Sequence, residues 1–211
     1  MSAPIDPSDF ILLILSSPSG AGKTTLTQRL LKRFQDLRFS VSHTTRAPRV
    51  GEVNGKDYHF VDRKTFEGLV ADDAFVEWAE VHGNLYGTSR AEIENARKTS
   101  GGILFDIDYQ GARQIRAKLP EVIGIFVLPP SMDELLRRLR GRASESEEVV
   151  QRRFNVAKRE IEHYALFDYV LLNDGLDEAF ARLEGIVLAE RTKRIKKAFL
   201  AEKLLREGKL S

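Results

Sequence analysis

The 211-residue sequence contains no cysteine, which excludes a disulfide framework and a thiolate metal site. Its four histidines are scattered and show no zinc-binding spacing. No apolar run approaches the roughly 18 residues that a membrane-spanning helix needs. The opening MSAPIDPSDF lacks the basic and apolar regions of a secretory signal. These absences predict a cytoplasmic enzyme without a membrane partner.

An excess of charge is also missing, since 33 Lys and Arg residues are balanced by 31 Asp and Glu residues. Affinity for phosphate or nucleic acid must therefore come from local basic clusters. One cluster, RTKRIKK at 191–197, has no interleaved aromatic residue for base stacking. We interpret it as a solvated helix end and expect no nucleic-acid partner. Nearby apolar residues would pack on the core or on a second subunit, which leaves a homo-oligomer open: Ile195, Phe199, Leu204 and Leu205.

The stretch FILLILSSPSGAGKTTLTQR, at 10–29, reads as a buried strand, a tight loop and a helix. Its loop follows the phosphate-loop pattern G-x-x-x-x-G-K-[ST], except that Ser17 replaces the first glycine. Backbone N–H groups of such a loop wrap an anion at a helix start. Lys23 would reach the outer phosphates of a nucleotide, and the Thr24 hydroxyl would bind Mg²⁺. The alternative is an ordinary strand–turn–helix with an incidental lysine.

Strand-like and helix-like segments alternate along most of the remaining chain, which is typical of the α/β class, with a parallel sheet covered on both faces. Further strands are expected at 39–42, 103–105, 122–128 and 168–172. Helices are expected at 24–34, 89–98, 109–118 and 132–140, then after a cap formed by Ser144 and Glu147, and as one long helix at 176–205. The block 41–88 is different, because it has short strands and many Arg, Gly, Ser and Thr residues. It predicts a small, mainly antiparallel insertion that carries ligand contacts.

Asp106 ends the apolar strand in GILFDID. Ligands of parallel sheets gather outside the carboxyl ends of the strands, where the phosphate loop also lies. Asp106 is therefore the natural carboxylate to hold Mg²⁺, or its waters, opposite Thr24. The alternative is a simple strand-end or helix-capping aspartate.

Arginines form two groups with different expected roles. Arg46 and Arg49 lie in the insertion with Tyr58 and Tyr86, and guanidinium forks suit phosphate. The second group surrounds the glycine-interrupted run GRASES and predicts a lid at about 140–152: Arg137, Arg138, Arg140, Arg142, Arg152 and Arg153. Lid arginines would neutralise charge on a transferring phosphoryl group. A solvated helix face is the alternative for this second group.

Glu77 and Asp108 offer two acceptors, which suit a base with adjacent N–H donors such as guanine. Adenine presents a donor beside an acceptor and matches this pair poorly. The hydroxyls of Ser42 and Thr88 would donate to the guanine oxygen. Spacing alone does not establish this pocket.

The run SVSHTTRAPRVGEVNGKDYHFV, with SPSGAGKT before it and EWAEVHGNLYGTSR and LFDIDYQGA after it, resembles the bacterial-type guanylate kinase family over nearly the whole chain. The resemblance implies a P-loop nucleoside monophosphate kinase-like fold, a parallel sheet flanked by helices with a small mixed-sheet insertion and a lid. It divides the chain into a core (1–40 and 89–211) and a GMP-binding insertion (41–88). It implies transfer of the ATP γ-phosphoryl group to GMP, with dGMP as a second acceptor, and Mg²⁺ as cofactor.

The resemblance also implies roles for individual residues. It assigns ATP to Ser17, Pro18, Ser19, Gly20, Ala21, Gly22, Lys23, Thr24, Thr25 and Asn173. It assigns GMP to Ser42, Arg46, Arg49, Tyr58, Glu77, Tyr86, Thr88 and Asp108. It assigns catalysis to Lys23, Arg46, Arg138, Arg142 and Arg153, and the metal to Thr24 and Asp106. Ser17 departs from the general loop pattern, and we treat it as tolerated.

Two rival functions remain at this point. The first is a phosphate-loop kinase that acts on another nucleotide or on a sugar phosphate. The second is a guanylate-kinase-like scaffold domain that binds peptides and has lost catalysis. Such scaffolds usually lack parts of the phosphate loop or the acceptor contacts, which are present here.

Overall fold

The buried strand β1 is the centre of a five-stranded parallel sheet with the order β2-β7-β1-β8-β9. The computed structural model describes residues 9–81, 83–141 and 146–210. The strands of this sheet are β1 (Ile11–Ser16), β2 (Leu37–Phe39), β7 (Gly102–Asp106), β8 (Ile123–Leu128) and β9 (Tyr169–Leu172). All four pairings in the sheet are parallel. Their carboxyl ends therefore lie along one edge, where the phosphate loop begins.

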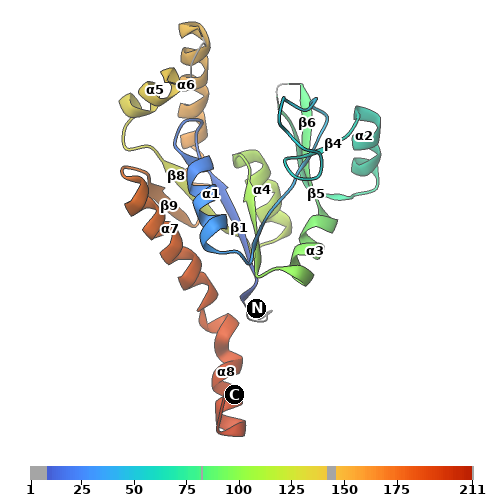
Figure 1. Cartoon of the computed structure of the whole chain (residues 1–211), viewed down its shortest axis with the longest axis vertical. Helices are drawn as coiled ribbons and strands as arrows, with labels where there is room; N and C mark the ends of the chain where they lie inside the picture. The colour runs from blue at the N-terminus through green and yellow to red at the C-terminus, as the bar shows by residue number, and fades with distance from the viewer. Residues whose placement is uncertain (1–8, 82, 142–145, 211) are drawn as a thin grey trace.

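Helices cover both faces of this sheet (Figure 1). On one face, α1 (Lys23–Arg33) and α7 (Leu176–Arg191) bury side chains such as Leu30 and Leu183 against β1. On the other face, α3 (Arg90–Thr99) and α4 (Tyr109–Lys118) contribute Ile93 and Ile115 to a second apolar cluster. The predicted α/β fold class, with a parallel sheet flanked by helices, is confirmed.

A second, four-stranded sheet with the order β4-β3-β6-β5 stands apart from the first. Its strands are β3 (His43–Thr44), β4 (His59–Phe60), β5 (Phe75–Val81) and β6 (Asn84–Ser89), and helix α2 (Arg63–Ala71) lies between β4 and β5 in the chain. The sheet is mixed, because β3 pairs with β4 in parallel and with β6 antiparallel. Its own small core contains Phe66, Phe75 and Leu85.

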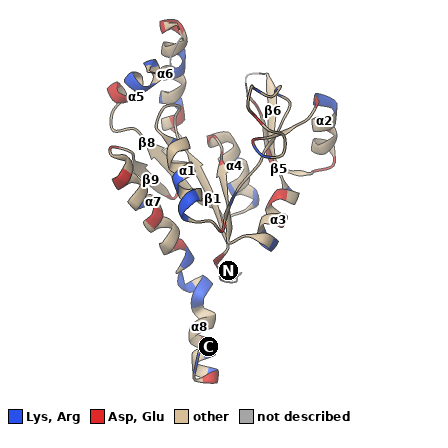
Figure 2. Cartoon of the chain, in the orientation of Figure 1, with Lys and Arg blue, Asp and Glu red and all other residues tan. Residues whose placement is uncertain are grey.

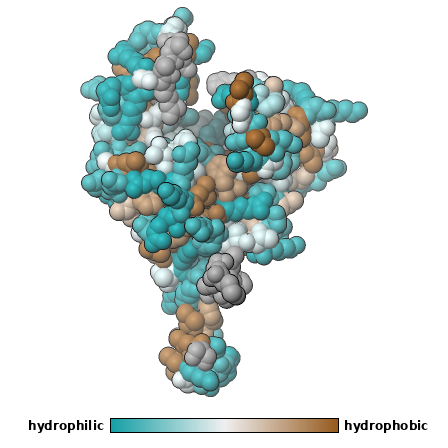
Figure 3. Space-filling view, in the orientation of Figure 1, coloured by the Kyte–Doolittle hydropathy of each residue, from teal (hydrophilic) through white to brown (hydrophobic). Residues whose placement is uncertain are grey.

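Two helices, α5 (Met132–Arg140) and α6 (Glu147–Ile161), form an arm on the side opposite the small sheet (Figure 1). An apolar cluster that includes Leu135 and Phe154 packs the two helices of the arm against each other. A short 3₁₀ helix, η2 (Tyr164–Leu166), leads from α6 to β9. The surface is hollowed between the arm and the small sheet (Figure 3). Basic residues are frequent on α5 and α6 (Figure 2).

The last helix, α8 (Arg194–Glu207), projects away from the sheet and carries an apolar patch (Figures 1 and 3). Ile195 and Leu205 are 83% and 88% exposed. Among the described residues, no helix combines the length and the apolarity that crossing a membrane requires.

Three expected element boundaries are wrong. The strand expected at 39–42 lies earlier, as β2 at Leu37–Phe39, and 40–42 form the gap before β3, where the Ser40 N–H still donates to the Leu104 carbonyl before the chain leaves the first sheet. The single helix expected at 176–205 is two helices: α7 ends at Arg191, Lys193 has an extended backbone with a ψ of 137°, and α8 begins at Arg194. The Thr192 hydroxyl donates to the Leu188 and Ala189 carbonyls at this end of α7.

The third error concerns the cap of α6. Helix α6 begins at Glu147, so the N-cap position falls on Ser146, whose hydroxyl accepts from the Val149 N–H. The expected cap, Ser144, lies outside the described residues. Ser89 and Ser131 cap their helices by accepting from the N–H groups of Glu92 and Glu134.

Candidate functional site

The turn between β1 and α1 has the shape of an anion-binding loop. Gly20 and Gly22 have φ values of 93° and 96°, which other residues rarely adopt. No side chain in the described part of the chain caps α1 at Gly22, so its first N–H groups stay available for an anion. A cavity of about 260 Å³ faces the turn and is lined by Ser17, Pro18, Ser19, Gly20, Gly22, Lys23, Thr24, Asp108 and Glu160.

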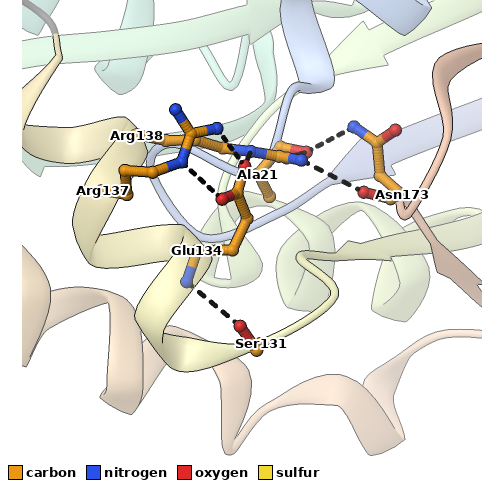
Figure 4. A network of polar contacts seen from close by, with 6 residues as sticks. All are labelled: Ala21, Ser131, Glu134, Arg137, Arg138 and Asn173. Carbon is orange, nitrogen blue, oxygen red and sulfur yellow. Dashed lines mark hydrogen bonds and ion pairs between the residues drawn. The ribbon is translucent and has the colours of Figure 1, made fainter.

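Long-range hydrogen bonds hold the back of this loop (Figure 4). The buried Asn173 amide, at the end of β9, donates to the Ala21 carbonyl at 2.7 Å. The Arg138 guanidinium donates to the carbonyls of Ala21 and Asn173, each at 3.4 Å, and to Glu134 at 2.7 Å. The hydrogen bonds from Arg137 and Arg138 lower the pKa of Glu134 to about 2. A side chain at Gly22 would collide with the Asn173 amide. The close contact between the loop and this amide therefore requires glycine at this position.

Asn173, Arg138 and Thr25 also line a neighbouring cavity of about 410 Å³ with Gly20, Gly22, Arg137, Gly141, Asp174 and Leu176. This cavity continues from the loop toward α5. It is large enough for the nucleoside part of a nucleotide whose phosphates lie on the loop.

Lys23 and Asp106 form an ion pair across the ends of α1 and β7. Asp106 stands beside Leu15 of β1, which brings it to the loop as the sequence predicted. Thr24 is exposed at the start of α1. In the described ranges, no group of three or more His, Cys, Asp or Glu residues could enclose a metal by itself. A cation here would need oxygen atoms from a bound phosphate and from water, as Mg²⁺ commonly does.

Helix α6 contacts the loop at Ser19. The Arg153 guanidinium donates to the Ser19 hydroxyl at 2.9 Å, and the Ser19 N–H donates to the Glu160 carboxylate at 3.2 Å. Arg142, the third expected arginine of this arm, lies outside the described residues. Sequence reasoning missed Glu160, because nothing in the sequence distinguishes it from the other glutamates of a charged helix.

A third cavity, of about 210 Å³, opens between the small sheet and α4. It brings together predicted residues from five segments: Ser42, Tyr58, Glu77, Tyr86, Asp106 and Asp108. Asp108 lines this cavity and the loop cavity, so the two adjoin. Asp108 also caps α4 by accepting from the N–H groups of Gln110 and Gly111, both at 3.0 Å.

Glu77 is buried in this cavity wall, with 4% of its surface exposed. A β-bulge between Phe75 and Glu77 interrupts the alternation of β5, so three successive residues are buried. Burial raises the pKa of Glu77 to about 7, against a lowering effect of the Thr88 hydrogen bond. Thr88, which is fully buried, donates its hydroxyl to Glu77 at 2.7 Å. Its proton is therefore directed at Glu77 rather than at the cavity.

Arg46 lies beside the ring of Tyr58, with 5.3 Å between the guanidinium carbon and the ring centroid. Its Nη2 donates to both carboxylate oxygens of Glu52, at 2.8 and 2.9 Å, which raises the pKa of Arg46. The Arg49 N–H donates to the same carboxylate at 2.7 Å, while its side chain is exposed. Tyr58 and Tyr86 lie edge to face at 6.0 Å. Glu52 was not predicted; its only signal is its position shortly after the two arginines.

Comparisons with known proteins agree with this geometry. A family model described as guanylate kinase matches residues 11–190. A guanylate kinase from Shewanella oneidensis is 51% identical over 181 residues, which cover 85% of this chain and 87% of the relative. One from Neisseria gonorrhoeae is 50% identical over 194 residues, covering 92% and 95%. The solved guanylate kinase of Anaplasma phagocytophilum is 36% identical, has a TM-score of 0.74, and is matched over 94% of this chain and 95% of that one.

Proposed function

The chain belongs to the guanylate kinase family and transfers the γ-phosphoryl group of ATP to GMP, and we propose that the three cavities described above hold these substrates. ATP would place its phosphates on the loop and its nucleoside in the cavity beside Asn173. GMP would occupy the cavity beside Glu77. The observation that supports this placement most is that Asp108 lines both the loop cavity and the Glu77 cavity, because the donor and acceptor phosphates must meet for transfer.

Guanine would be read by the Glu77 and Asp108 carboxylates, which accept from its N1–H and exocyclic amino group. Ser42, on the wall of the same cavity, would donate to the guanine oxygen. Thr88 would act indirectly, since its hydroxyl fixes the Glu77 carboxylate. No polar side chain of this set requires a ribose 2′-hydroxyl, and we propose dGMP as a second acceptor.

The GMP phosphate would be bound by Arg46, Arg49, Tyr58 and Tyr86. Arg46 already binds an anion, because its Nη2 donates to both oxygens of Glu52 while its Nη1 donates to the Ala47 carbonyl. A phosphate in place of the Glu52 carboxylate would take up the same charge-assisted hydrogen bonds. The GMP phosphate would replace the Glu52 carboxylate at the Arg46 guanidinium, which would stay in place over the Tyr58 ring.

Transfer itself requires alignment and charge stabilisation more than covalent chemistry. An oxygen of the GMP phosphate, anionic near neutral pH, would attack in line, so no strong general base and no covalent intermediate are needed. Lys23, Arg138 and Arg153 lie around the loop and would stabilise the charge of the phosphoryl group. The resemblance adds Arg142 to this set.

Mg²⁺ fits the donors at the loop. The Thr24 hydroxyl would bind it directly, and the Asp106 carboxylate would hold it or its waters after release from Lys23. When bound, the ion would neutralise negative charge on the phosphates.

The division of labour follows the two sheets. We assign 41–88 to GMP binding, and 1–40 with 89–211 to the core, with a lid at about 140–152, where α5 ends and α6 begins. A cytoplasmic location and a place in purine nucleotide metabolism suit an enzyme that consumes ATP and GMP. We leave α8 as the candidate contact of a homo-oligomer, and analytical ultracentrifugation of the chain with and without residues 194–211 would test it.

A side-by-side assay tests the proposed acceptor. The purified protein should phosphorylate GMP best and dGMP next, with AMP, CMP and UMP far weaker. A Glu77→Gln variant should lose activity with GMP while its KM for ATP changes little. A preference for AMP, or an equal loss for both substrates, would contradict the assignment of the Glu77 cavity.

A further inference from the structure

Helix α6 contacts the backbone N–H and the hydroxyl group of a single phosphate-loop residue, Ser19. The Ser19 N–H donates to the Glu160 carboxylate at 3.2 Å, and the Ser19 hydroxyl accepts from Arg153 at 2.9 Å. Glu160 is 141 positions away from Ser19 in the sequence, so this contact depends on the folded arm. The arm therefore brings one cation and one anion to the same point of the loop.

Glu160 shares the loop cavity with Lys23 and Asp108. It is half-buried there, and burial together with the Asp108 charge raises the pKa of its carboxyl group, against the Ser19 hydrogen bond and the Lys23 charge. A negative charge in this place has an energetic cost. The Ser19 N–H is the contact that offsets part of it.

The chemistry of this contact is that of phosphate binding. Backbone N–H groups of such loops donate to phosphate oxygens, and here one of them donates to a carboxylate oxygen. One N–H cannot give a full hydrogen bond to two anions. The two anions also repel each other, and repulsion is stronger in a partly buried cavity than in water.

We propose that the Glu160 carboxylate competes with the phosphates of ATP for the Ser19 N–H and thereby weakens ATP binding. The proposal rests on the assignment of the loop as the ATP phosphate site. Arg153, on the same helix, has the opposite effect, because its positive charge favours phosphate. Glu160 thus lowers the affinity of the donor site for ATP, and it is not one of the residues that bind guanine.

Isothermal titration with Mg²⁺–ATP, without GMP, tests the proposal on three variants of the full chain. Glu160→Gln removes the charge and keeps the size, and Glu160→Ala removes both charge and acceptor. Both should bind ATP about 3- to 10-fold more tightly than the parent chain, because one anion leaves the cavity. Glu162→Gln is the matched control: it removes the same charge from the exposed end of α6, and its ATP affinity should stay unchanged.

Unchanged or weaker ATP binding in both Glu160 variants would overturn the proposal, and weaker binding would show that the carboxylate positions the loop instead. A Lys23→Ala variant separates this result from failure of the assigned site. If Lys23→Ala loses ATP affinity while the Glu160 variants match the parent, the donor site stands and the competition is refuted. If Lys23→Ala binds ATP as well as the parent chain does, the assigned donor site is itself wrong, and the proposal fails with it.

Discussion

Replacing Glu77 by glutamine should raise stability at alkaline pH while it weakens GMP binding. The folded protein raises the pKa of Glu77 from 4.5 to about 7, so it binds more protons here than the unfolded chain between these pH values. The free energy of unfolding therefore falls as pH rises through this window. A shift of this size corresponds to about 3 kcal/mol, reached above pH 7, and 4% exposure leaves little solvent screening. Glutamine has no charge to bury and avoids this loss.

The same substitution should damage the acceptor site. A carboxylate that accepts hydrogen bonds from guanine contributes about 1.5–3 kcal/mol per bond, so its loss should raise KM for GMP roughly 10- to 150-fold. The KM for ATP should change little, since Glu77 lines the other cavity. In the parent chain, KM for GMP should rise as pH falls below 7, because protonation removes the negative charge of Glu77 and turns one of its two acceptor oxygens into a donor. That rise should be absent in Glu77→Gln.

Urea unfolding of the parent, Glu77→Gln and Glu80→Gln chains at pH 5, 6, 7 and 8 measures the first effect. Glu80→Gln is the control, because Glu80 is an exposed residue of the same strand and should leave the parent's pH dependence in place. The parent should lose up to about 3 kcal/mol relative to Glu77→Gln between pH 5 and 8. Parallel stability curves for the parent and Glu77→Gln chains would refute the burial argument, whatever happens to KM.

Three further outcomes are expected. Lys23→Ala should lower kcat at least about 100-fold in a coupled ADP assay, with the urea midpoint close to that of the parent, because the lysine acts on the transferring charge. Asn173→Ala should lower the free energy of unfolding by about 1–3 kcal/mol, because the Ala21 carbonyl loses its 2.7 Å donor; a change below about 0.5 kcal/mol would contradict this role. Tyr109→Phe should be neutral in thermal unfolding, whereas Tyr109→Ala should cost about 0.5–1.5 kcal/mol beyond its buried area, because Tyr109 stacks on His163 at 3.7 Å.

Local patterns explain why the phosphate loop and the parallel sheet could be predicted. The apolar run of β1 and the positive-φ glycines of the loop lie close together in the sequence, so one short stretch reveals both. The end of α7 was missed because 190–194 contain neither glycine nor proline and apolar residues resume at Ile195, whereas the break itself is the extended backbone of Lys193. The burial of Glu77 follows from a bulge, which an alternating pattern does not reveal.

Long-range polar partners were the least predictable part of the site. Asn173 was expected near adenine, but its amide also supports the Ala21 carbonyl, 152 positions away in sequence. Glu160 and Glu52 look like ordinary surface glutamates, and only the fold brings them to Ser19 and Arg46. The spacing of charged side chains along a helix or loop does not indicate which distant residues they contact.

The partners share one feature that bears on how this chain binds phosphate. Carboxylates already face the groups proposed for phosphate: Asp106 at Lys23, Glu52 at Arg46, Glu134 at Arg138 and Glu160 at the Ser19 N–H. Each carboxylate orients its partner, so a substrate phosphate would replace an anion at these groups instead of ordering a mobile cation. We expect this exchange to lower net affinity, because the displaced carboxylate must be resolvated or paired again. The acidic residues beside the proposed phosphate sites should therefore influence substrate affinity together with the basic ones.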